Sequence, residues 1–90
     1  MYTLKLLPQA EDDLRALKRN EPKSFAKAEK LLEELMLHPT TGTGHPHQLS
    51  GDRAGQWARS ITKKHRLVYL IKELEVIVAV LSAYGHYDDK

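Results

Sequence analysis

Side chains that can transfer protons and bind phosphate are concentrated in the second half of the chain. His45 and His47 lie in a Gly-rich stretch, Arg66 lies in the run HRLVY, and His86 and Tyr87 lie near the C-terminus. A histidine can accept or give a proton near neutral pH, and a tyrosine hydroxyl can donate one. Together with an arginine they form a sufficient set for cleaving RNA without a metal or other cofactor. A base would take the 2′-hydroxyl proton, the guanidinium would stabilise the pentacoordinate phosphate, and an acid would protonate the leaving 5′-oxygen.

Positive charge is concentrated in the same part of the chain. Residues 41–71 contain five Lys and Arg against one Asp, whereas residues 1–40 are balanced at seven against seven. Residues 72–90 have two basic against four acidic side chains, so the net charge of +2 conceals a local excess. A localised basic stretch concentrates the electrostatic field where phosphates bind. RNA is therefore the expected partner.

Two arginines and a tryptophan are predicted to share one face of a β-hairpin. If its turn is only the two residues Lys63 and Lys64, Arg66 lies on the same face as Arg59 and Trp57. Guanidiniums bind phosphate and a tryptophan can stack on a base, so this face is expected to contact RNA. The alternatives are that Arg59 pairs with a helix carboxylate and that Trp57 fills the core, which for Trp57 is the favoured interpretation.

The remaining candidates are the turn lysines and the loop histidines. Lys63 and Lys64 can contact backbone phosphates through charge alone, although solubility explains turn lysines equally well. His45 is assigned to RNA binding, yet a histidine in a loop is more often an ordinary surface residue than a catalyst. A metal site made of His45 and His47 with Asp88 or Asp89 is disfavoured because the histidines lie in a flexible loop and no third ligand lies at a fixed spacing.

The elements that must position these groups fit one domain spanning residues 1–90. The chain has no cysteine and no apolar run long enough to cross a bilayer or to serve as a signal peptide. A cytoplasmic location without membrane contact is therefore expected. Apolar periodicity and turn residues predict the following elements: a strand over Tyr2–Leu7, helices over Pro8–Arg19 and from Pro22 to His38, a long loop over Pro39–Gly55, and strands over Trp57–Thr62, Arg66–Lys72 and Glu75–Ala83.

These elements predict an α+β fold. The short link between the helices requires an antiparallel helix hairpin, and the short links between the last three strands imply an antiparallel meander. The run Val76 to Leu81 is apolar at every position, which is typical of a central strand. With the N-terminal strand added, we expect a four-stranded sheet with both helices on one face.

A longer pattern spans most of these motifs. It reads G-x-G-x-P-x-x-L, then G-x-W-x-R-x-I-T-x-x-H-R-L-V-Y, and then a terminal H-Y. In this chain it is formed by Gly42, Gly44, Pro46, Leu49, Gly55, Trp57, Arg59, Ile61, Thr62, His65, Arg66, Leu67, Val68, Tyr69, His86 and Tyr87. The pattern, together with the order and length of the helices and strands, resembles the YoeB/Txe family of toxins in the RelE/ParE toxin–antitoxin superfamily.

The resemblance implies a RelE-like, microbial-RNase-like fold and ribosome-dependent endoribonuclease activity on mRNA, which would inhibit translation. It also implies a cognate antitoxin of the YefM type, whose C-terminal segment covers the active site, and a possible homodimer. No cofactor is implied.

Carried over by position, the family's catalytic residues fall on Arg66, His86 and Tyr87. The family's acidic residue, a proposed general base, falls on His47, which can also accept a proton. Two basic positions of the family are Ser50 and Ser60 here. Fewer cations should weaken phosphate binding.

The resemblance and these departures from it leave three candidate functions. The first is a toxin endoribonuclease, possessing either full or reduced activity. The second is a non-catalytic member that binds a protein partner or the ribosome, which the changes at His47, Ser50 and Ser60 favour. Gyrase inhibition, as in the ParE branch, is disfavoured because the HRLVY run and the histidine–tyrosine ending are typical of the RNase branch.

Overall fold

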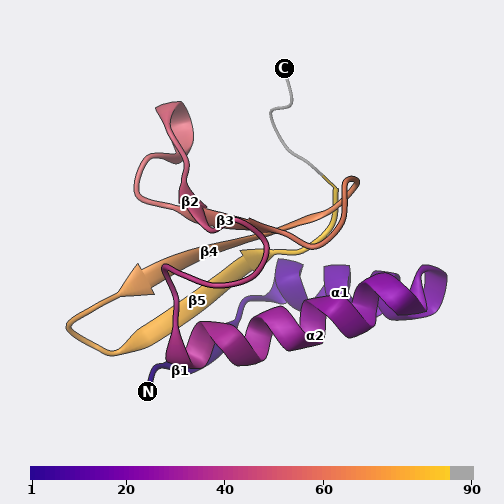
Figure 1. Cartoon of the computed structure of the whole chain (residues 1–90), viewed down its shortest axis with the longest axis horizontal. Coiled ribbons are helices and arrows are strands. Elements are labelled where there is room, and N and C mark those ends of the chain that lie inside the picture. The colour runs from indigo at the N-terminus through magenta and orange to yellow at the C-terminus, as the bar shows by residue number, and fades with distance from the viewer. Residues whose placement is uncertain (86–90) are drawn as a thin grey trace.

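The computed structural model describes residues 1–85, which form two helices and five strands (Figure 1). The helices are α1 (Pro8–Asn20) and α2 (Pro22–Leu37). The strands are β1 (Thr3–Leu6), β2 (His47–Gln48), β3 (Trp57–Ser60), β4 (Arg66–Lys72) and β5 (Ile77–Ser82), with one short 3-10 turn, η1 (Gly51–Arg53). Neither helix is long and apolar enough to cross a bilayer.

The strands form a single mixed sheet in the order β1-β5-β4-β3-β2. Strand β1 is parallel to β5, and the other neighbouring pairs are antiparallel. The predicted α+β class, helix hairpin and meander are confirmed. The predicted strand count of four is wrong, because β2 forms within the stretch expected to be a loop and pairs with β3.

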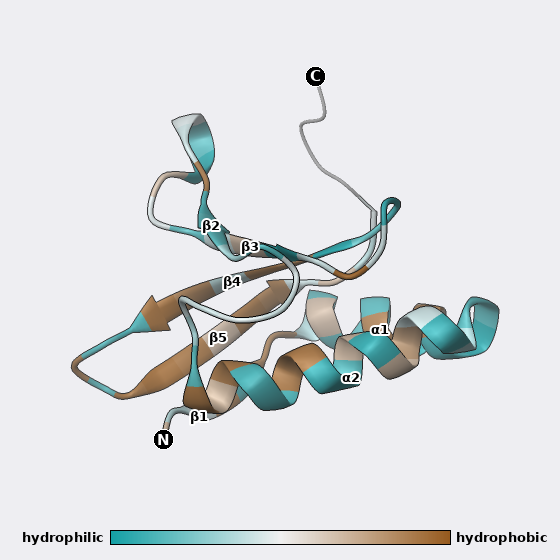
Figure 2. Ribbon diagram, viewed as in Figure 1, coloured by the Kyte–Doolittle hydropathy of each residue, from teal (hydrophilic) through white to brown (hydrophobic). Residues whose placement is uncertain are grey.

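Both helices begin at a proline, which suits the first helical turn because its missing N–H has no partner there. In Figure 1 both helices lie on the same side of the sheet. The core between the two layers is formed mainly by these residues: Ala10, Leu14, Leu17, Ala28, Leu31, Leu35, Leu67, Tyr69, Val78 and Val80. Hydrophobic colouring follows β4 and β5, whereas the segment around β2 and η1 is largely hydrophilic (Figure 2).

The hairpin between β3 and β4 has a longer turn than predicted. Strand β3 ends at Ser60 and β4 begins at Arg66, so residues 61–65 form the connection. The Thr62 hydroxyl stabilises this loop by accepting hydrogen bonds from the backbone N–H groups of Lys64 at 3.1 Å and His65 at 3.2 Å. As a result the register differs by one residue from the predicted one, and Arg66 pairs with Ser60.

That shift places Arg59 and Arg66 on opposite faces. Arg59 pairs with Leu67, a fully buried core residue on the helix side, and adjacent residues in a strand point to opposite faces. The prediction that Arg59, Trp57 and Arg66 share a face is therefore wrong. Trp57 lies on the helix side, where it is half-buried and packs against the core, as the favoured interpretation held.

Candidate functional site

A row of residues crosses the face of the sheet that the helices leave uncovered. His47 of β2 pairs with Ala58 of β3, Ala58 pairs with Val68 of β4, and Val68 pairs with Ser82 of β5. Directly paired residues share a face, and Val68 alternates with the core residue Leu67, so this row lies opposite the helices. Ala58 and Val68 are fully buried, which makes the centre of the row small and apolar.

Arg66 of β4 lies on this same face of the sheet. It is two residues from Val68 and pairs directly with Ser60. With strands about 4.8 Å apart and residues about 3.3 Å apart along a strand, the Cα atoms of Arg66 and His47 are separated by roughly 12 Å. Arg66 is half-buried. The structure therefore carries a guanidinium and an imidazole on one helix-free face.

The His47 ring is exposed and one of its nitrogens is engaged. Its Nδ1 lies 2.9 Å from the backbone carbonyl oxygen of His45. Because a carbonyl only accepts, Nδ1 must carry the hydrogen, and in the neutral ring Nε2 then holds the lone pair. The turn depends on His45, whose positive φ of 53° is uncommon for a residue other than glycine. His47 is thus held in the tautomer that can accept a proton through Nε2.

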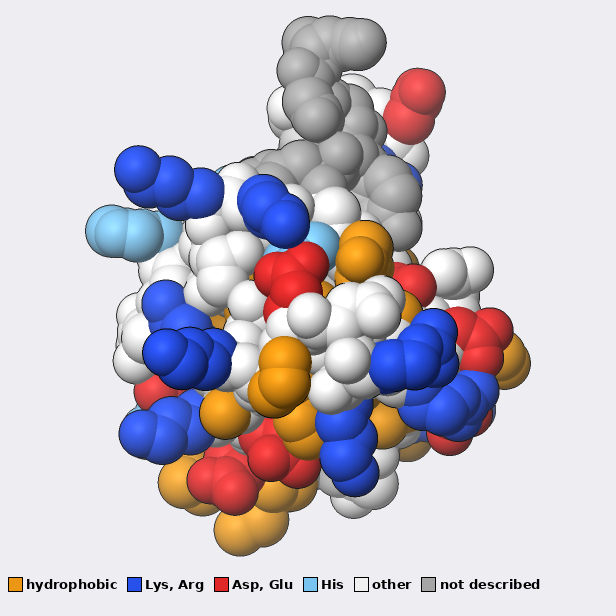
Figure 3. All heavy atoms as spheres, turned by 90° about the vertical axis from the view of Figure 1, so that its right-hand side faces the viewer, with side chains coloured by type: hydrophobic (Ala, Val, Ile, Leu, Met, Phe, Trp, Pro, Cys, Tyr) orange, Lys and Arg blue, Asp and Glu red, His pale blue; other side chains and the backbone are white. Residues whose placement is uncertain are grey.

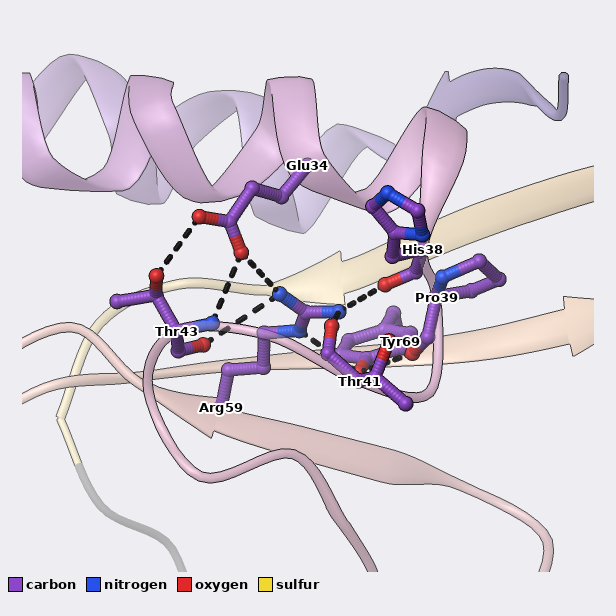
Figure 4. Close-up of polar contacts among 7 residues, drawn as sticks. All are labelled: Glu34, His38, Pro39, Thr41, Thr43, Arg59 and Tyr69. Carbon is purple, nitrogen blue, oxygen red and sulfur yellow. Dashed lines mark hydrogen bonds and ion pairs between the residues drawn. The ribbon is translucent and has the colours of Figure 1, made fainter.

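The loop that carries both histidines is anchored on the opposite face by Arg59 (Figure 4). Arg59 is fully buried. Its guanidinium donates hydrogen bonds to the Tyr69 hydroxyl at 3.1 Å, Glu34 Oε1 at 2.8 Å, the Thr41 carbonyl at 2.7 Å, the Thr43 carbonyl at 3.4 Å and the His38 carbonyl. A charged group can remain buried when it is paired and its donors are satisfied, as they are here.

Glu34 and Tyr69 complete this network. Glu34 of α2 accepts hydrogen bonds from the backbone N–H of Thr43 at 2.9 Å and from its hydroxyl at 2.7 Å. The contacts with Thr43, followed by the charge of Arg59, hold the pKa of Glu34 below its ordinary value. Burial raises the pKa of Tyr69 against the opposing effect of Arg59, and its hydroxyl donates to the Pro39 carbonyl at 2.8 Å. The loop is thereby joined to both layers of the fold.

Two glycines allow the loop to lie close to Glu34 of α2 and to the β3–β4 hairpin. Gly42 has a φ of 115°, and a Cβ there would lie 2.6 Å from Glu34 Oε1. Gly44 has a φ of 87°, and a Cβ there would lie 2.8 Å from the Ser60 carbonyl oxygen. The Gly44 carbonyl accepts a hydrogen bond from the Ser60 N–H at 2.7 Å. These contacts fix the backbone directly before His45.

The prediction that Arg59 binds RNA is not supported by this arrangement. Its fully buried guanidinium presents no surface to a ligand, and the alternative of a helix carboxylate partner is the one observed. The sequence does contain the relevant signal. Glu34 lies on α2 between the core residues Leu31 and Leu35, so a carboxylate borders the helix face that covers the sheet.

The other predicted RNA contacts are exposed. His45 lies on the loop surface, and Lys63 and Lys64 lie in the hairpin loop. Lys64 Nζ is 3.3 Å from Glu21 Oε2 at the junction of α1 and α2. Figure 3 looks onto this end of the molecule and shows Lys and Arg side chains spread over it.

His65 is a structural residue that the sequence interpretation did not single out. It is 2% exposed, and its Nε2 lies 2.9 Å from Glu21 Oε2. This contact, opposed by partial burial and aided by Lys64, holds the pKa of Glu21 below its ordinary value. Its only sequence signal is its position beside Arg66 in the HRLVY run.

Two of the predicted catalytic residues, His86 and Tyr87, lie outside the described residues. The same holds for Asp88 and Asp89, the acids considered for a metal site. Within residues 1–85, no group of three or more His, Cys, Asp or Glu side chains is arranged to hold a metal ion.

Comparison with known proteins identifies relatives along nearly the full chain. A toxin named YoeB from Mycobacterium bovis is 32% identical over 87 residues, which cover 97% of this chain and 100% of the relative. The YoeB toxin of Escherichia coli is 29% identical over 68 residues, covering 76% of this chain and 81% of the relative.

Solved structures show the same fold. A YoeB/ParE toxin from Agrobacterium tumefaciens superposes with a TM-score of 0.88 at 30% identity, covering 94% of this chain and 99% of that one. The toxin in a YoeB–YefM complex from Staphylococcus aureus superposes with a TM-score of 0.81 at 27% identity, covering 97% and 99%. Residues 7–87 match the family described as YoeB-like toxins of bacterial type II toxin–antitoxin systems. Because this match spans most of the chain, and the fold agrees with it, the chain belongs to the YoeB-like toxins.

Proposed function

We propose that this toxin is an endoribonuclease that cleaves mRNA on the ribosome and thereby inhibits translation. The observation that carries the proposal is the placement of His47 and Arg66 on one helix-free face, with His47 held in a tautomer whose Nε2 can accept a proton. The separation of their Cα atoms can be bridged, because histidine and arginine side chains each extend several ångströms. Both side chains can thus reach one nucleotide bound at this face of the sheet.

Each residue has a defined role in this proposal. His47 Nε2 takes the proton from the 2′-hydroxyl, and the resulting alkoxide attacks the neighbouring phosphorus. Arg66 binds the non-bridging oxygens and stabilises the negative charge that develops there. His86 protonates the leaving 5′-oxygen, and Tyr87 donates a hydrogen bond to the phosphate. The bond to the 5′-oxygen breaks, leaving a 2′,3′-cyclic phosphate and a 5′-hydroxyl, so the proposed step needs no redox partner.

RNA binding outside the reacting phosphate is assigned to His45, Lys63 and Lys64. All three are exposed, and the two lysines lie in the loop that directly precedes β4 and Arg66. Charged side chains at such positions attract the RNA backbone without reading its sequence. Their contribution should therefore weaken as the salt concentration rises.

The partners of this toxin are proposed from its relatives. The Staphylococcus aureus relative was solved both as a dimer and in complex with YefM. We propose a YefM-like antitoxin that covers the face bearing His47 and Arg66, and a homodimer of the free toxin. Cleavage of ribosome-bound mRNA and its suppression by an antitoxin encoded beside the toxin gene test these proposals together.

A second candidate function is a toxin relative that binds the ribosome without cutting mRNA. Ser60 favours this function. It stands at a basic position of the family and pairs directly with Arg66. One cation of the family is therefore missing beside the proposed phosphate site. Growth arrest separates the two functions. A cutting toxin loses its effect when His86 is replaced by Ala, whereas a binding module keeps it.

A further inference from the structure

His65 connects the turn between the helices to the end of the described chain. Its buried ring lies between Glu21, at the junction of α1 and α2, and Gly85, which follows β5. Nε2 is 2.9 Å from Glu21 Oε2, and Nδ1 is 2.8 Å from the backbone nitrogen of Gly85. The ring of Tyr84 packs against the imidazole with centroids 4.4 Å apart.

The two hydrogen bonds define the tautomer of His65. A backbone N–H can only donate, so Nδ1 must accept from Gly85 and cannot carry a hydrogen. Nε2 therefore carries the hydrogen and donates it to the Glu21 carboxylate. A carboxylate that holds the opposite side of an imidazole fixes both its tautomer and its orientation. Glu21 is itself held by the Ser24 hydroxyl, which donates to Oε1 at 3.2 Å.

The backbone leading to the C-terminus is fixed at three points. The Ala83 N–H donates to the buried Asp13 carboxylate at 2.9 Å. The Gly85 N–H is bound by His65, and the Gly85 carbonyl accepts from the backbone N–H of Arg66 at 3.2 Å. Both polar backbone groups of Gly85 are thus held by the residues at the start of β4, one of which is the proposed phosphate-binding arginine.

We propose that His65 is a positioning residue for the cleavage reaction. By holding Gly85 against β4, beside Arg66, it fixes the last described residue before His86 in the sequence. This inference rests on the proposed function, because it assigns His86 as the acid. His65 does not itself act on RNA, since it is 2% exposed and both of its ring nitrogens are engaged.

Two amide substitutions separate the two hydrogen bonds of His65. His65→Asn places an amide oxygen near the position of Nδ1 and can still accept from Gly85. His65→Gln places its amide nitrogen near the position of Nε2 and can still donate to Glu21, but it leaves the Gly85 N–H without its acceptor. Both variants lose ring packing, so each serves as the matched control for the other.

The test is single-turnover cleavage of mRNA on isolated ribosomes, measured together with toxin–ribosome binding. His65→Asn is expected to cleave within about threefold of the wild-type rate, whereas His65→Gln loses about 10- to 100-fold, with ribosome binding unchanged in both. Equal losses in the two variants, or wild-type cleavage by His65→Gln, would overturn the proposal. If both variants unfold, Glu21→Gln and Glu21→Ala replace them. Gln retains an acceptor for Nε2 and should cleave faster than Ala, and equal rates would count against positioning.

Hydrogen exchange of the Gly85 amide distinguishes a failure of this inference from a failure of the proposed function. The amide is expected to be protected in the wild type and in His65→Asn, and to exchange at least tenfold faster in His65→Gln. Fast exchange of the Gly85 amide in the wild type would show that its hydrogen bond to His65 does not hold the backbone. A protected Gly85 amide in a wild-type toxin that leaves ribosomal mRNA intact would instead refute the proposed function, and with it the positioning role.

Discussion

Arg59 and Arg66 lie on opposite faces of one β-hairpin. Arg59 pairs with Leu67 and points into the layer between sheet and helices, whereas Arg66 pairs with Ser60 on the face without helices. Arg59 anchors the segment that leads to His45 and His47, and Arg66 lies on the face that carries the proposed phosphate site. One arginine of this hairpin thus stabilises the fold, and the other is the proposed phosphate-binding residue.

Removal of Arg59 is expected to destabilise the fold strongly. Arg59→Ala removes one donor from Glu34 and one from Tyr69 and leaves the Thr41 carbonyl without its arginine donor. Breaking a fully buried ion pair costs about 3–5 kcal/mol, and the loss here should approach the lower end because the Glu34 side chain is 34% exposed. Urea unfolding measures the change. A matched control is Arg15→Ala, because the Arg15–Asp12 pair is exposed, with side-chain exposures of 66% and 68%, and should change the free energy of unfolding by less than about 1 kcal/mol. Similar losses in the two variants would contradict the anchoring role.

Stability is expected to fall in acid through Glu34. Its pKa is lowered in the folded state from an ordinary value of 4.5, chiefly by its hydrogen bonds to Thr43. The stabilisation is therefore fully present above that value and is lost as the pH falls from it through the lowered folded-state pKa. Glu34→Gln should be less stable than the wild type at neutral pH and should lose less stability on acidification. The pKa of Glu21 is also lowered in the folded state, so Glu34→Gln should keep part of the loss of stability in acid. Parallel pH profiles for the wild type and Glu34→Gln would be inconsistent with this assignment.

Replacements of His47 test its role as the base. His47→Gln cannot accept the proton and should reduce the cleavage rate by about 10²- to 10⁴-fold. His47→Glu, which introduces the acidic residue type of the family, should cleave. A glutamate ionises roughly two pH units below a histidine, so the acidic limb of its pH–rate profile should move to lower pH by about that amount. Full activity in His47→Gln would rule out His47 as the base.

The lysines of the hairpin loop should contribute to binding through charge. For single-stranded RNA, each lost phosphate contact is expected to reduce the slope of log affinity against log salt by about 0.7. Lys63→Ala should show this reduction. The control is Lys27→Ala, an exposed lysine of α2, which packs on the sheet face opposite the one carrying Arg66. Binding titrations over a range of salt concentrations provide the measurement, and equal slopes for the wild type and Lys63→Ala would remove Lys63 from the interface.

Much of the fold could be predicted because local signals and packing agree. Pro8 and Pro22 mark the helix starts, and the predicted range of β4, Arg66–Lys72, is the observed one. Strand β2 could not be predicted, because two exposed residues in a Gly-rich loop carry no apolar periodicity. Its formation depends on backbone pairing with β3, which is a tertiary contact.

The face of Arg59 was mispredicted for a specific physical reason. Side chains alternate between the two faces along a strand. Whether Arg59 shares a face with Arg66 therefore depends on the number of residues in the turn that joins their strands. The polar residues there fit a two-residue turn, but Thr62 stabilises a longer loop through its hydroxyl. The role of His65 was also inaccessible, because its partner Glu21 is distant in sequence and becomes a neighbour only when the helix hairpin packs on the sheet.

We propose above that Arg66, on the helix-free face, supports cleavage of mRNA on the ribosome. The most direct measurement is primer extension on mRNA from a reconstituted translation reaction containing wild-type toxin or Arg66→Ala. Under this proposal the wild type makes discrete cuts in ribosome-bound mRNA, and Arg66→Ala, verified as folded by circular dichroism, loses about 10²- to 10³-fold in rate. Intact mRNA with the wild type, or equal cutting by both proteins, would contradict it.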